Sequence, residues 1–391
     1  MTNVLASAAV LHPPGKPLVD RAIVVGGGLG GLSVALQLRK IGIDAQVYER
    51  NAFLSGGEGT LISLFPNGCK ALNEASPDIL TKLRSLGIAN NPANLVFPDG
   101  TKFGEWKLST LMEEKYGLPV IAILWKNVLK ALDEALPEEC KHFNYECCGI
   151  TQEDDGAVAH FKKDGETISV KAPLVIGADG IRSTVRRALF GNIPPRDNGR
   201  TMWRAVIDMN LCSSQGLESG AYASVFDGRT LFIINGVQDK LYWAFSLEDD
   251  CCEGSTKIRS KTGEEAKERI LAYFEKSSLA TAIIQATEPE LILERRVLDL
   301  PVLSSWFQGN TVLLGDAVHA VTPSLGQGAN LAFEDGMQLA KLLASSSDLR
   351  TALEEYQALQ MPRAKEISKR SNPKNQNDDS FYDWLYNPKM L

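Results

Sequence analysis

Glycines and a carboxylate near the start of the sequence have the types and the spacing of a dinucleotide site. Gly26, Gly28 and Gly31 fit the pattern G-x-G-x-x-G, directly after a short apolar run and at the start of a helical pattern. The first glycine permits a tight turn, the second lets backbone approach a pyrophosphate, and the third lets the helix pack close to a sheet. Glu49 follows about twenty residues later, where a carboxylate accepts hydrogen bonds from ribose hydroxyls. This pattern predicts a bound dinucleotide without distinguishing NAD from FAD.

Two later segments also place glycine and aspartate at the ends of apolar runs. Asp179-Gly180 follows the run at residues 174–177, and Gly315-Asp316 follows the run at residues 311–314. A loop from Pro323 to Gly328 then leads into a long helical pattern. Three motifs in this order are far more specific than any one of them.

With these motifs the chain resembles the class A flavoprotein monooxygenases, the family of p-hydroxybenzoate hydroxylase, salicylate hydroxylase and zeaxanthin epoxidase. The resemblance runs from about residue 21 to residue 371 and includes the stretch at residues 356–364. It implies non-covalent FAD, with NAD(P)H, O2 and a small organic molecule as substrates. One oxygen atom from O2 enters the organic substrate through a flavin C4a-hydroperoxide, in an aromatic hydroxylation or an alkene epoxidation. Because the flavin carries the chemistry, no catalytic side chain is assigned.

The resemblance also implies roles for single residues. Asp316 accepts a hydrogen bond from a hydroxyl of the ribityl chain, and Asp179-Gly180 serves the pyrophosphate region and the passing NAD(P)H. The helix that begins near Ala329 directs its positive end at the pyrimidine side of the ring, where negative charge gathers on reduction, which favours a flavin over a nicotinamide. The implied cofactor-binding residues are Gly26, Gly28, Leu29, Gly31, Glu49, Arg50, Lys126, Asp179, Gly180, Gly315, Asp316, Pro323, Gly326, Gly328, Ala329 and Asn330.

Several positions depart from the family pattern or have a second interpretation. Lys126 stands where the family has an arginine that reaches the FAD phosphates, so the charge is kept and the planar fork is lost. Residues 55–59 lack the family's arginine near the glycine pair. Arg50 could reach the adenosine or simply end a strand, and Asp179 could cap a helix. His319 could act as a base, although a packed histidine fits its place in the motif better.

Aromatic residues in the middle of the chain are candidates for the substrate site. In strand patterns such residues either line a cavity or fill a core. They are Trp203, Phe226, Phe232, Tyr242 and Trp243. Arg204 could anchor an anionic substrate, or it could face outward and pair with a neighbouring aspartate. The substrate itself stays open.

The pattern of apolar residues predicts the elements that position these motifs. Strand, glycine turn, helix and strand between residues 21 and 48 form a βαβ unit, which requires a parallel sheet. Aromatic-rich runs between residues 200 and 247, separated by glycine turns, predict an antiparallel sheet. We therefore expect an α/β fold with a Rossmann-type FAD-binding lobe, a mixed antiparallel substrate lobe and a C-terminal helix. The expected division is a flexible extension at 1–20, an FAD-binding domain at 21–90, 120–190 and 300–345, a substrate-binding domain at 91–119 and 191–299, and a C-terminal helix and tail at 346–391.

The composition sets limits on other functions. The chain has 391 residues, 44% of them hydrophobic, and a net charge of −7, which argues against a basic nucleic-acid-binding face. Seven cysteines and four widely separated histidines favour neither a disulfide framework nor a metal site. No run reaches the length of a membrane-spanning helix. We expect a soluble protein of the cytoplasm or of an organelle, with targeting by residues 1–20 left open and the oligomeric state unknown.

Other functions share parts of this pattern. A flavin-dependent reductase of the geranylgeranyl reductase type carries all three motifs in looser form, and a non-catalytic protein could use FAD as a structural element. A flavin-dependent halogenase should carry a Trp-x-Trp-x-Ile-Pro signature, which the sequence lacks. Hydroxylation and epoxidation, and NADH and NADPH, are not distinguished by the residues.

Overall fold

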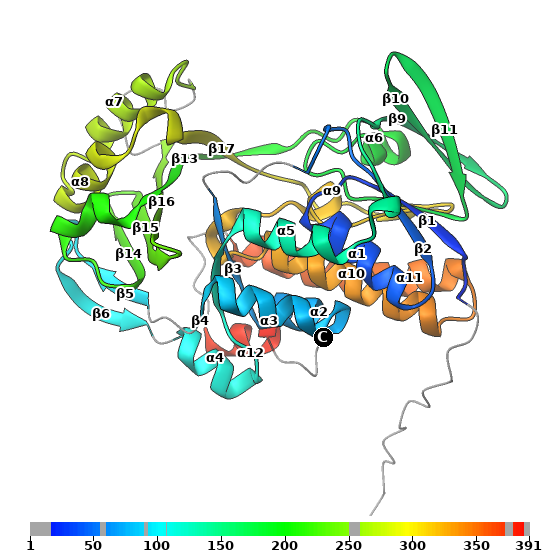
Figure 1. Ribbon diagram of the computed structural model, residues 1–391, viewed down its shortest axis with the longest axis horizontal. Coiled ribbons are helices and arrows are strands. Elements are labelled where there is room, and N and C mark those ends of the chain that lie inside the picture. Colours follow the sequence, from blue (N-terminus) through cyan, green and yellow to red (C-terminus); the bar gives the residue numbers. More distant parts are fainter. Residues whose placement is uncertain are drawn as a thin grey trace, which may run out of the picture.

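The computed structural model describes residues 17–54, 60–89, 93–106, 108–249, 259–371 and 378–386. Most of the expected N-terminal extension, the departure at residues 55–59 and part of the tail after residue 371 lie outside the described residues. Two lobes stand beside each other, one built on the N-terminal βαβ unit and one on a large twisted sheet (Figure 1). The expected α/β architecture with a Rossmann-like lobe, a second sheet and a C-terminal helix is confirmed.

The first lobe contains a mostly parallel sheet whose central strands consist mainly of buried, apolar residues. Its order is β18-β19-β12-β1-β2-β8, and only the edge pair β18–β19 is antiparallel. Helices on its faces include α1 and α10, which pack against each other. The strands are β18 (Phe307–Gln308), β19 (Thr311–Leu313), β12 (Leu174–Gly177), β1 (Arg21–Val25), β2 (Asp44–Tyr48) and β8 (Lys141–His142).

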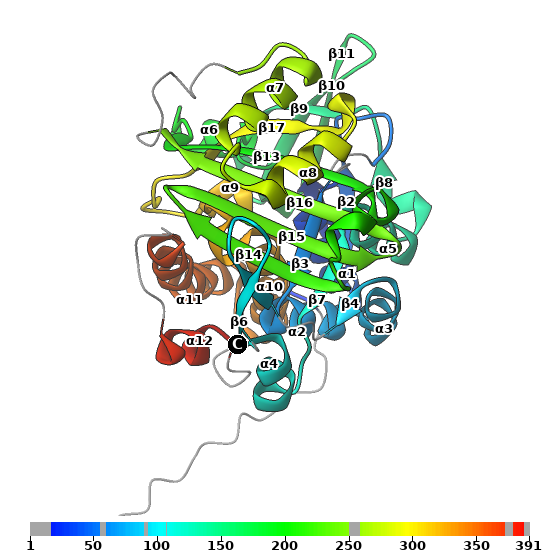
Figure 2. The same cartoon turned by 90° about the vertical axis from the view of Figure 1, so that its left-hand side faces the viewer.

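The second lobe is a seven-stranded sheet in the order β17-β13-β16-β15-β14-β5-β6. All of its neighbours are antiparallel except β14 and β5. Figure 2 shows this sheet face on, with α7 and α8 lying over it. The strands are β17 (Leu293–Asp299), β13 (Arg196–Asp208), β16 (Lys240–Glu248), β15 (Arg229–Val237), β14 (Gly220–Phe226), β5 (Ala93–Val96) and β6 (Lys102–Trp106).

The remaining elements surround these two sheets. Two small sheets have the orders β11-β10-β9 and β3-β7-β4. Their strands are β9 (Glu146–Glu153), β10 (Gly156–Lys163), β11 (Glu166–Ala172), β3 (Leu61–Leu64), β4 (Ile88–Ala89) and β7 (Ile121–Leu124). The helices are α1 (Leu29–Lys40), α2 (Pro66–Ala75), α3 (Pro77–Leu86), α4 (Leu108–Tyr116), α5 (Trp125–Ala135), α6 (Thr184–Phe190), α7 (Gly263–Tyr273), α8 (Ser278–Ala286), α9 (Asp316–His319), α10 (Gly328–Ser345), α11 (Leu349–Arg370) and α12 (Asp379–Tyr386).

Two boundaries differ from the expectation, and each difference has a local cause. Helix α6 begins at Thr184 rather than at residue 181, because Asp179 and Ser183 cap its first turn. Strand β13 begins at Arg196 rather than at residue 202, although its first residues are polar. Arg196 pairs with Asp299 of β17, and Arg296 of β17 pairs with Asp197, so ion pairs across two strands replace the missing apolar pattern.

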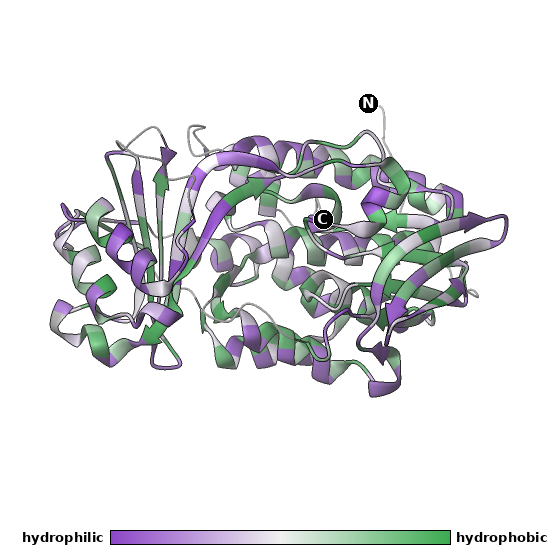
Figure 3. Ribbon diagram, turned by 90° about the horizontal axis from the view of Figure 1, so that it is seen from above, coloured by the Kyte–Doolittle hydropathy of each residue, from purple (hydrophilic) through white to green (hydrophobic). Residues whose placement is uncertain are grey.

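Strands β13 and β17 run from the second lobe toward the first, so they connect the two (Figure 1). Most helices show both hydrophilic and hydrophobic stretches (Figure 3), as expected where one face packs on a core and the other meets solvent. The lobes meet through an apolar cluster to which both contribute. It includes Leu61 of β3 and Leu124 of β7 from the first lobe, and Ile234 and Tyr242 from the seven-stranded sheet.

Candidate functional site

The turn between β1 and α1 and the first turn of α1 each contain one position that accepts only glycine. Gly26 has a φ of +109°, and a Cβ added there would lie 2.5 Å from the carbonyl oxygen of Ala178. A Cβ on Gly31 would lie 1.9 Å from the carbonyl oxygen of Gly26. Gly28 differs, because nothing lies within 4 Å of an added Cβ. The turn is therefore packed from behind and open at Gly28, where backbone N–H groups of the first turn of α1 have no side-chain cap.

Glu49 lies at the end of β2 and holds this turn in place. One carboxylate oxygen accepts the N–H of Gly27 at 2.8 Å. The other accepts the backbone N–H and the side-chain amide of Asn51, at 3.0 and 2.7 Å. Its neighbour Arg50 is exposed. The structure thus places the Glu49 carboxylate at the glycine turn, which is the position that the predicted ribose contact requires.

The Asp179 carboxylate caps α6. One of its oxygens accepts the N–H groups of Thr184 and Val185 at 2.6 and 3.1 Å, and the other accepts the hydroxyl of Ser183. The contacts of Asp179 therefore agree with the interpretation that it caps a helix. Gly180 has a φ of +78° with open space beside its Cα, so the backbone of this loop, rather than the carboxylate, is accessible to a ligand.

Asp316 is the first residue of α9 and is exposed, although Gly315 and Ala317 on either side are buried. Protein atoms crowded around the carboxyl raise its pKa, and the nearby His319 ring opposes that shift. An added Cβ on Gly328 would lie 3.9 Å from Oδ1 of Asp316, so the start of α10 stands directly beside this carboxylate. The sequence predicts both residues in one site, and the structure brings them together.

The loop before α10 exposes Pro323 and Gly326 and buries Gln327. The first turn of α10 contains no acidic residue and has no side-chain cap, so its N–H groups retain their positive field. Asn330 does not point outward. Its side chain accepts the N–H of Phe65 and donates to the carbonyl oxygens of Ser63 and Gly326, which joins α10 to β3 and to its own loop. The Asn330 side chain therefore stabilises the packing of α10 against β3 and the preceding loop.

Glycine contacts bring the motifs of the first lobe into one region. A Cβ on Gly30 would lie 3.1 Å from atoms of Leu314 and Ala332, and a Cβ on Gly315 would lie 3.1 Å from Ala332. Gly26 packs against the Asp179-Gly180 loop in the same way. The region thus offers open backbone at Gly28 and Gly180, an exposed carboxylate at Asp316 and an uncapped helix start. These groups fit a long dinucleotide with a pyrophosphate, a ribityl chain and a ring that gains negative charge.

Lys126 is exposed in the first turn of α5, which begins after β7 without an acidic residue or a side-chain cap. A cation at a helix start is unfavourable for the helix dipole unless an anion is nearby. The structure shows no ion pair for Lys126 among the described residues.

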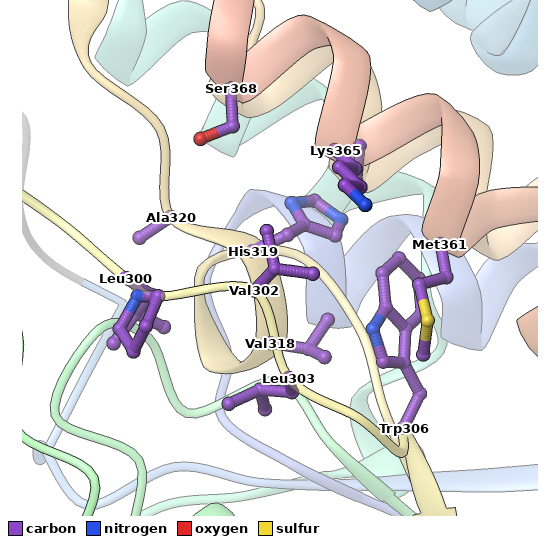
Figure 4. Close-up of a pocket in the computed structure, with 12 residues that line it drawn as sticks. Leu300, Val302, Leu303, Trp306, Val318, His319, Ala320, Met361, Lys365 and Ser368 are labelled. Carbon is purple, nitrogen blue, oxygen red and sulfur yellow. The ribbon is translucent and has the colours of Figure 1, made fainter.

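His319 is a packed residue. It is buried, its Nε2 lies 2.5 Å from Oδ2 of Asp335, and its ring lies against Trp306. Burial lowers the pKa of His319, but the charge and hydrogen bond of Asp335 outweigh burial and raise it overall. Figure 4 shows the pocket that His319 and Trp306 line together with Met361 and Lys365. Its volume of about 10 Å³ holds at most one water molecule, so it is not a substrate site.

The substrate candidates do not share one face of the seven-stranded sheet. Trp203 and Trp243 are fully buried in the core between the sheet and helices α7 and α8, and the indole of Trp243 donates to Thr287. The prediction that these two tryptophans line the substrate site is therefore wrong, because they point away from the first lobe. Phe232 lies on the opposite face with the apolar cluster that meets the first lobe.

Arg204 lies on that opposite face, because residues alternate along β13 and Trp203 points into the core. It is half-buried, and the structure shows no aspartate paired with it among the described residues. Its buried Nε has no hydrogen-bond partner there. The expectation of an outward Arg204 paired with a neighbouring aspartate is therefore wrong. Because a buried guanidinium nitrogen without an acceptor is costly, a hydrogen-bond acceptor from a ligand would stabilise this position.

Two further residues lie on this face, and the sequence predicts only the first of them, Tyr242, as a candidate. Tyr242 packs beside Phe232 in the cluster between the lobes, and burial raises the pKa of its hydroxyl while the charge of Arg204 opposes the shift. Arg295 on β17 lies diagonally across from Arg204, since Arg204 is opposite Leu293. The alternation of side chains along β16 separates Tyr242 from Trp243. Arg295 was missed, because nothing in its charge-rich strand distinguishes it from its neighbours.

Two further properties concern only the part of the chain that the structure describes. None of the helices described there has both the length and the apolar character that crossing a membrane requires. Among the same residues, no group of three or more His, Cys, Asp or Glu side chains could hold a metal ion.

Comparisons with known proteins agree with this geometry. Residues 112–371 match the FAD binding domain, and residues 24–60 match the NAD(P)-binding Rossmann-like domain. The chain is 26% identical over 366 residues to the FAD-dependent monooxygenase janM of Penicillium janthinellum, covering 89% of this chain and 75% of that protein. It is 32% identical over 340 residues to the chloroplastic zeaxanthin epoxidase of Spinacia oleracea, covering 83% of this chain and 47% of that protein. The chain thus spans about half the length of that epoxidase.

The fold has close counterparts among solved structures. Klebsiella pneumoniae HpxO complexed with FAD and uric acid is 23% identical, with a TM-score of 0.79 over 95% of this chain and 92% of that chain. CtdE in complex with FAD and a substrate has a TM-score of 0.78 at 19% identity, over 95% of this chain and 90% of that chain. At these identities the likeness establishes the fold alone.

Proposed function

The chain belongs to the FAD binding domain family and is an FAD-dependent monooxygenase that uses NAD(P)H, and from this premise we propose where its cofactor and its substrate bind. The single observation that carries the proposal is the convergence of three distant motifs on one region, with open backbone at Gly28 and the exposed carboxylate of Asp316. We propose FAD-binding segments at 21–90, 120–190 and 300–345 and substrate-binding segments at 91–119 and 191–299, with helix α4 of the latter packed against the first lobe.

The first lobe would hold FAD through backbone more than through side chains. The glycine turn at Gly28 would meet the pyrophosphate, Glu49 the adenosine ribose and Asp316 the ribityl chain. The uncapped start of α10 would face the pyrimidine side of the ring, where its N–H groups stabilise negative charge. Arg50 and Lys126 would add positive charge near the phosphates. Held by these residues, FAD would supply an acceptor for the hydride of NAD(P)H and the means to activate O2 for the transfer of one oxygen atom.

The second lobe would bind the organic substrate on the face that carries Arg204, Phe232 and Tyr242. Apolar side chains from both lobes, including Leu61 and Leu124, would exclude water from this region. The unpaired Nε of Arg204 supports a substrate with an anionic group on an apolar body. The reaction on it is an aromatic hydroxylation or an alkene epoxidation.

Oxidation of NADPH with a panel of ligands tests the substrate site. Aryl carboxylates such as benzoate and salicylate, compared with their neutral amides, should accelerate NADPH oxidation or flavin reduction in the wild type. Arg204→Gln should abolish the preference for the carboxylate, and Arg204→Lys should keep part of it. Arg350→Gln removes a positive charge from an exposed position in the first turn of α11 and serves as the matched control. Equal responses to carboxylates and amides in the wild type would reject the anionic substrate.

A flavin-dependent reductase that shares these motifs would consume no oxygen. Stoichiometric uptake of O2 with NADPH and substrate distinguishes the monooxygenase from that reductase. As for location, we propose the cytoplasm or an organelle; the relative from Spinacia oleracea is named chloroplastic.

A further inference from the structure

Helix α12 at the C-terminal side of the described chain packs behind the loop that leads into α10. The Tyr386 ring is 1% exposed and stacks on Phe65 with ring centroids 5.6 Å apart and an interplanar angle of 12°. Phe65 in turn lies against the loop, since a Cβ on Gly326 would lie 2.9 Å from the Phe65 ring. Leu325 of the loop belongs to the same apolar cluster as Tyr386 and Leu385.

A polar contact joins α12 to the loop directly. Gln327, the N-cap residue of α10, is fully buried and donates from Nε2 to the hydroxyl of Tyr386 at 3.3 Å. Its Oε1 accepts the side-chain amide of Asn67 in α2 at 3.0 Å. Gln327 is therefore held from behind by two helices that are far from it in sequence. Its Nε2 otherwise reaches only the carbonyl oxygen of Leu325, at 3.5 Å.

Arg363 fixes α12 relative to the same part of the fold. This buried residue of α11 forms a two-pronged ion pair with Glu334 of α10. It also donates to the carbonyl oxygen of Leu385 at 2.6 Å, and the Trp384 ring lies 5.0 Å from its guanidinium carbon. One cation thus joins α10, α11 and α12.

The outer side of α12 is held by α4. The Tyr116 hydroxyl donates to Asp383 at 2.5 Å, and Lys115 forms an ion pair with the same carboxylate. With contacts on both sides, α12 is a fixed part of the first lobe.

We propose that α12 is a positioning element for the flavin-facing loop, through Tyr386 and Gln327. This inference rests on the proposed function, because it assumes that residues 323–328 and the start of α10 face the flavin. A hydrogen bond from behind fixes the N-cap residue of α10 and therefore the direction of the N–H groups in its first turn. Those groups stabilise the negative charge of the reduced ring, so loosening Gln327 should weaken FAD binding and disfavour reduction.

The test compares Tyr386→Phe with Tyr222→Phe in the full-length FAD-loaded protein. Both changes remove one hydroxyl, but the Tyr222 hydroxyl donates to the carbonyl oxygen of Glu218 in the second lobe, away from the loop. Tyr386→Phe keeps the stacked ring and leaves Gln327 without its better acceptor. We expect its FAD dissociation constant to rise about five- to tenfold and the midpoint potential of bound FAD to become more negative. Tyr222→Phe should change neither.

Asp383→Asn provides a second variant, which loosens α12 from α4 without touching the loop. It should move the dissociation constant and the potential in the same direction by a smaller amount. If Tyr386→Phe and Asp383→Asn both lose thermal stability while the FAD dissociation constant and potential match the wild type, α12 only stabilises the fold and the inference is wrong. A wild-type protein that binds no FAD would instead contradict the proposed function.

Discussion

Oδ2 of Asp335 lies 2.5 Å from Nε2 of His319 inside the first lobe, and both side chains are buried. The same oxygen accepts the N–H of Gly315 at 2.8 Å. Through this carboxylate, helix α10 fixes the turn that ends just before Asp316. Asp335 therefore holds the backbone of the proposed cofactor site, and His319 supports it by pairing with the same carboxylate oxygen.

The first prediction concerns pH. The Asp335 pair raises the pKa of His319 above its ordinary value of 6.5, despite burial. A group whose pKa is higher in the folded state stabilises fully below the unfolded pKa, and this contribution is lost as pH rises through the folded pKa. The free energy of unfolding should therefore fall from pH 6.5 upward in the wild type. Urea unfolding at several pH values checks this, with His319→Gln as the comparison. An identical pH dependence in the two proteins would contradict the pair's role.

The second prediction concerns Asp316. Asp316→Ala should weaken FAD binding about ten- to hundredfold, because a charge-assisted hydrogen bond is worth roughly 1.5 to 3 kcal/mol. FAD titration monitored by flavin fluorescence measures the change. Asp348→Ala, which removes the cap of the distant α11, is the control and should leave FAD affinity unchanged. Unchanged affinity in Asp316→Ala would place the flavin elsewhere.

The third prediction concerns Lys126, which has no ion-pair partner in the part of the chain described. Lys126→Ala should weaken FAD binding and reduce its dependence on salt, because one screened charge pair is lost. Lys126→Arg should bind as well as the wild type or more tightly, since arginine adds a planar fork for phosphate. Titrations of the wild type and both variants with FAD at two salt concentrations measure the affinity and its salt dependence. Equal affinity of the wild type and Lys126→Ala at low salt would leave Lys126 outside the site.

The fourth prediction concerns the buried ion pair between Arg363 and Glu334. Arg363→Met should lower the free energy of unfolding by about 3 to 5 kcal/mol, because it leaves a buried carboxylate without its cation. Arg350→Met, which breaks an exposed pair on the same helix, should cost less than about 1 kcal/mol. Urea unfolding compares the two variants. Similar small losses in both would mean that the Glu334 carboxylate finds another partner.

Much of the first lobe could be predicted because its signals are local. Apolar runs such as residues 22–25 and 174–177 form buried parallel strands. Gly26 and Gly31, which the motif predicts, lie where backbone contacts leave no room for a side chain. The long helix at residues 328–345 agrees at both ends with the expected range. The roles of these residues toward FAD stay predictions.

The rest depended on contacts between distant segments. Strand β17 is rich in charge, and its Arg296 is paired with Asp197 and Asp249, which no periodicity reveals. Trp203 and Arg204 are neighbours in sequence but point to opposite faces, and only the position of α7 and α8 decides which face is core. The Gln327–Tyr386 contact joins residues 59 positions apart.

An anaerobic titration of the purified protein with NADPH, followed by admission of air, tests the central claim most directly. The account predicts a yellow protein whose non-covalent FAD bleaches when NADPH is added and regains its colour when O2 is admitted. A folded protein that takes up no FAD, or one whose FAD neither NADPH nor NADH bleaches with or without substrate candidates, would contradict the account.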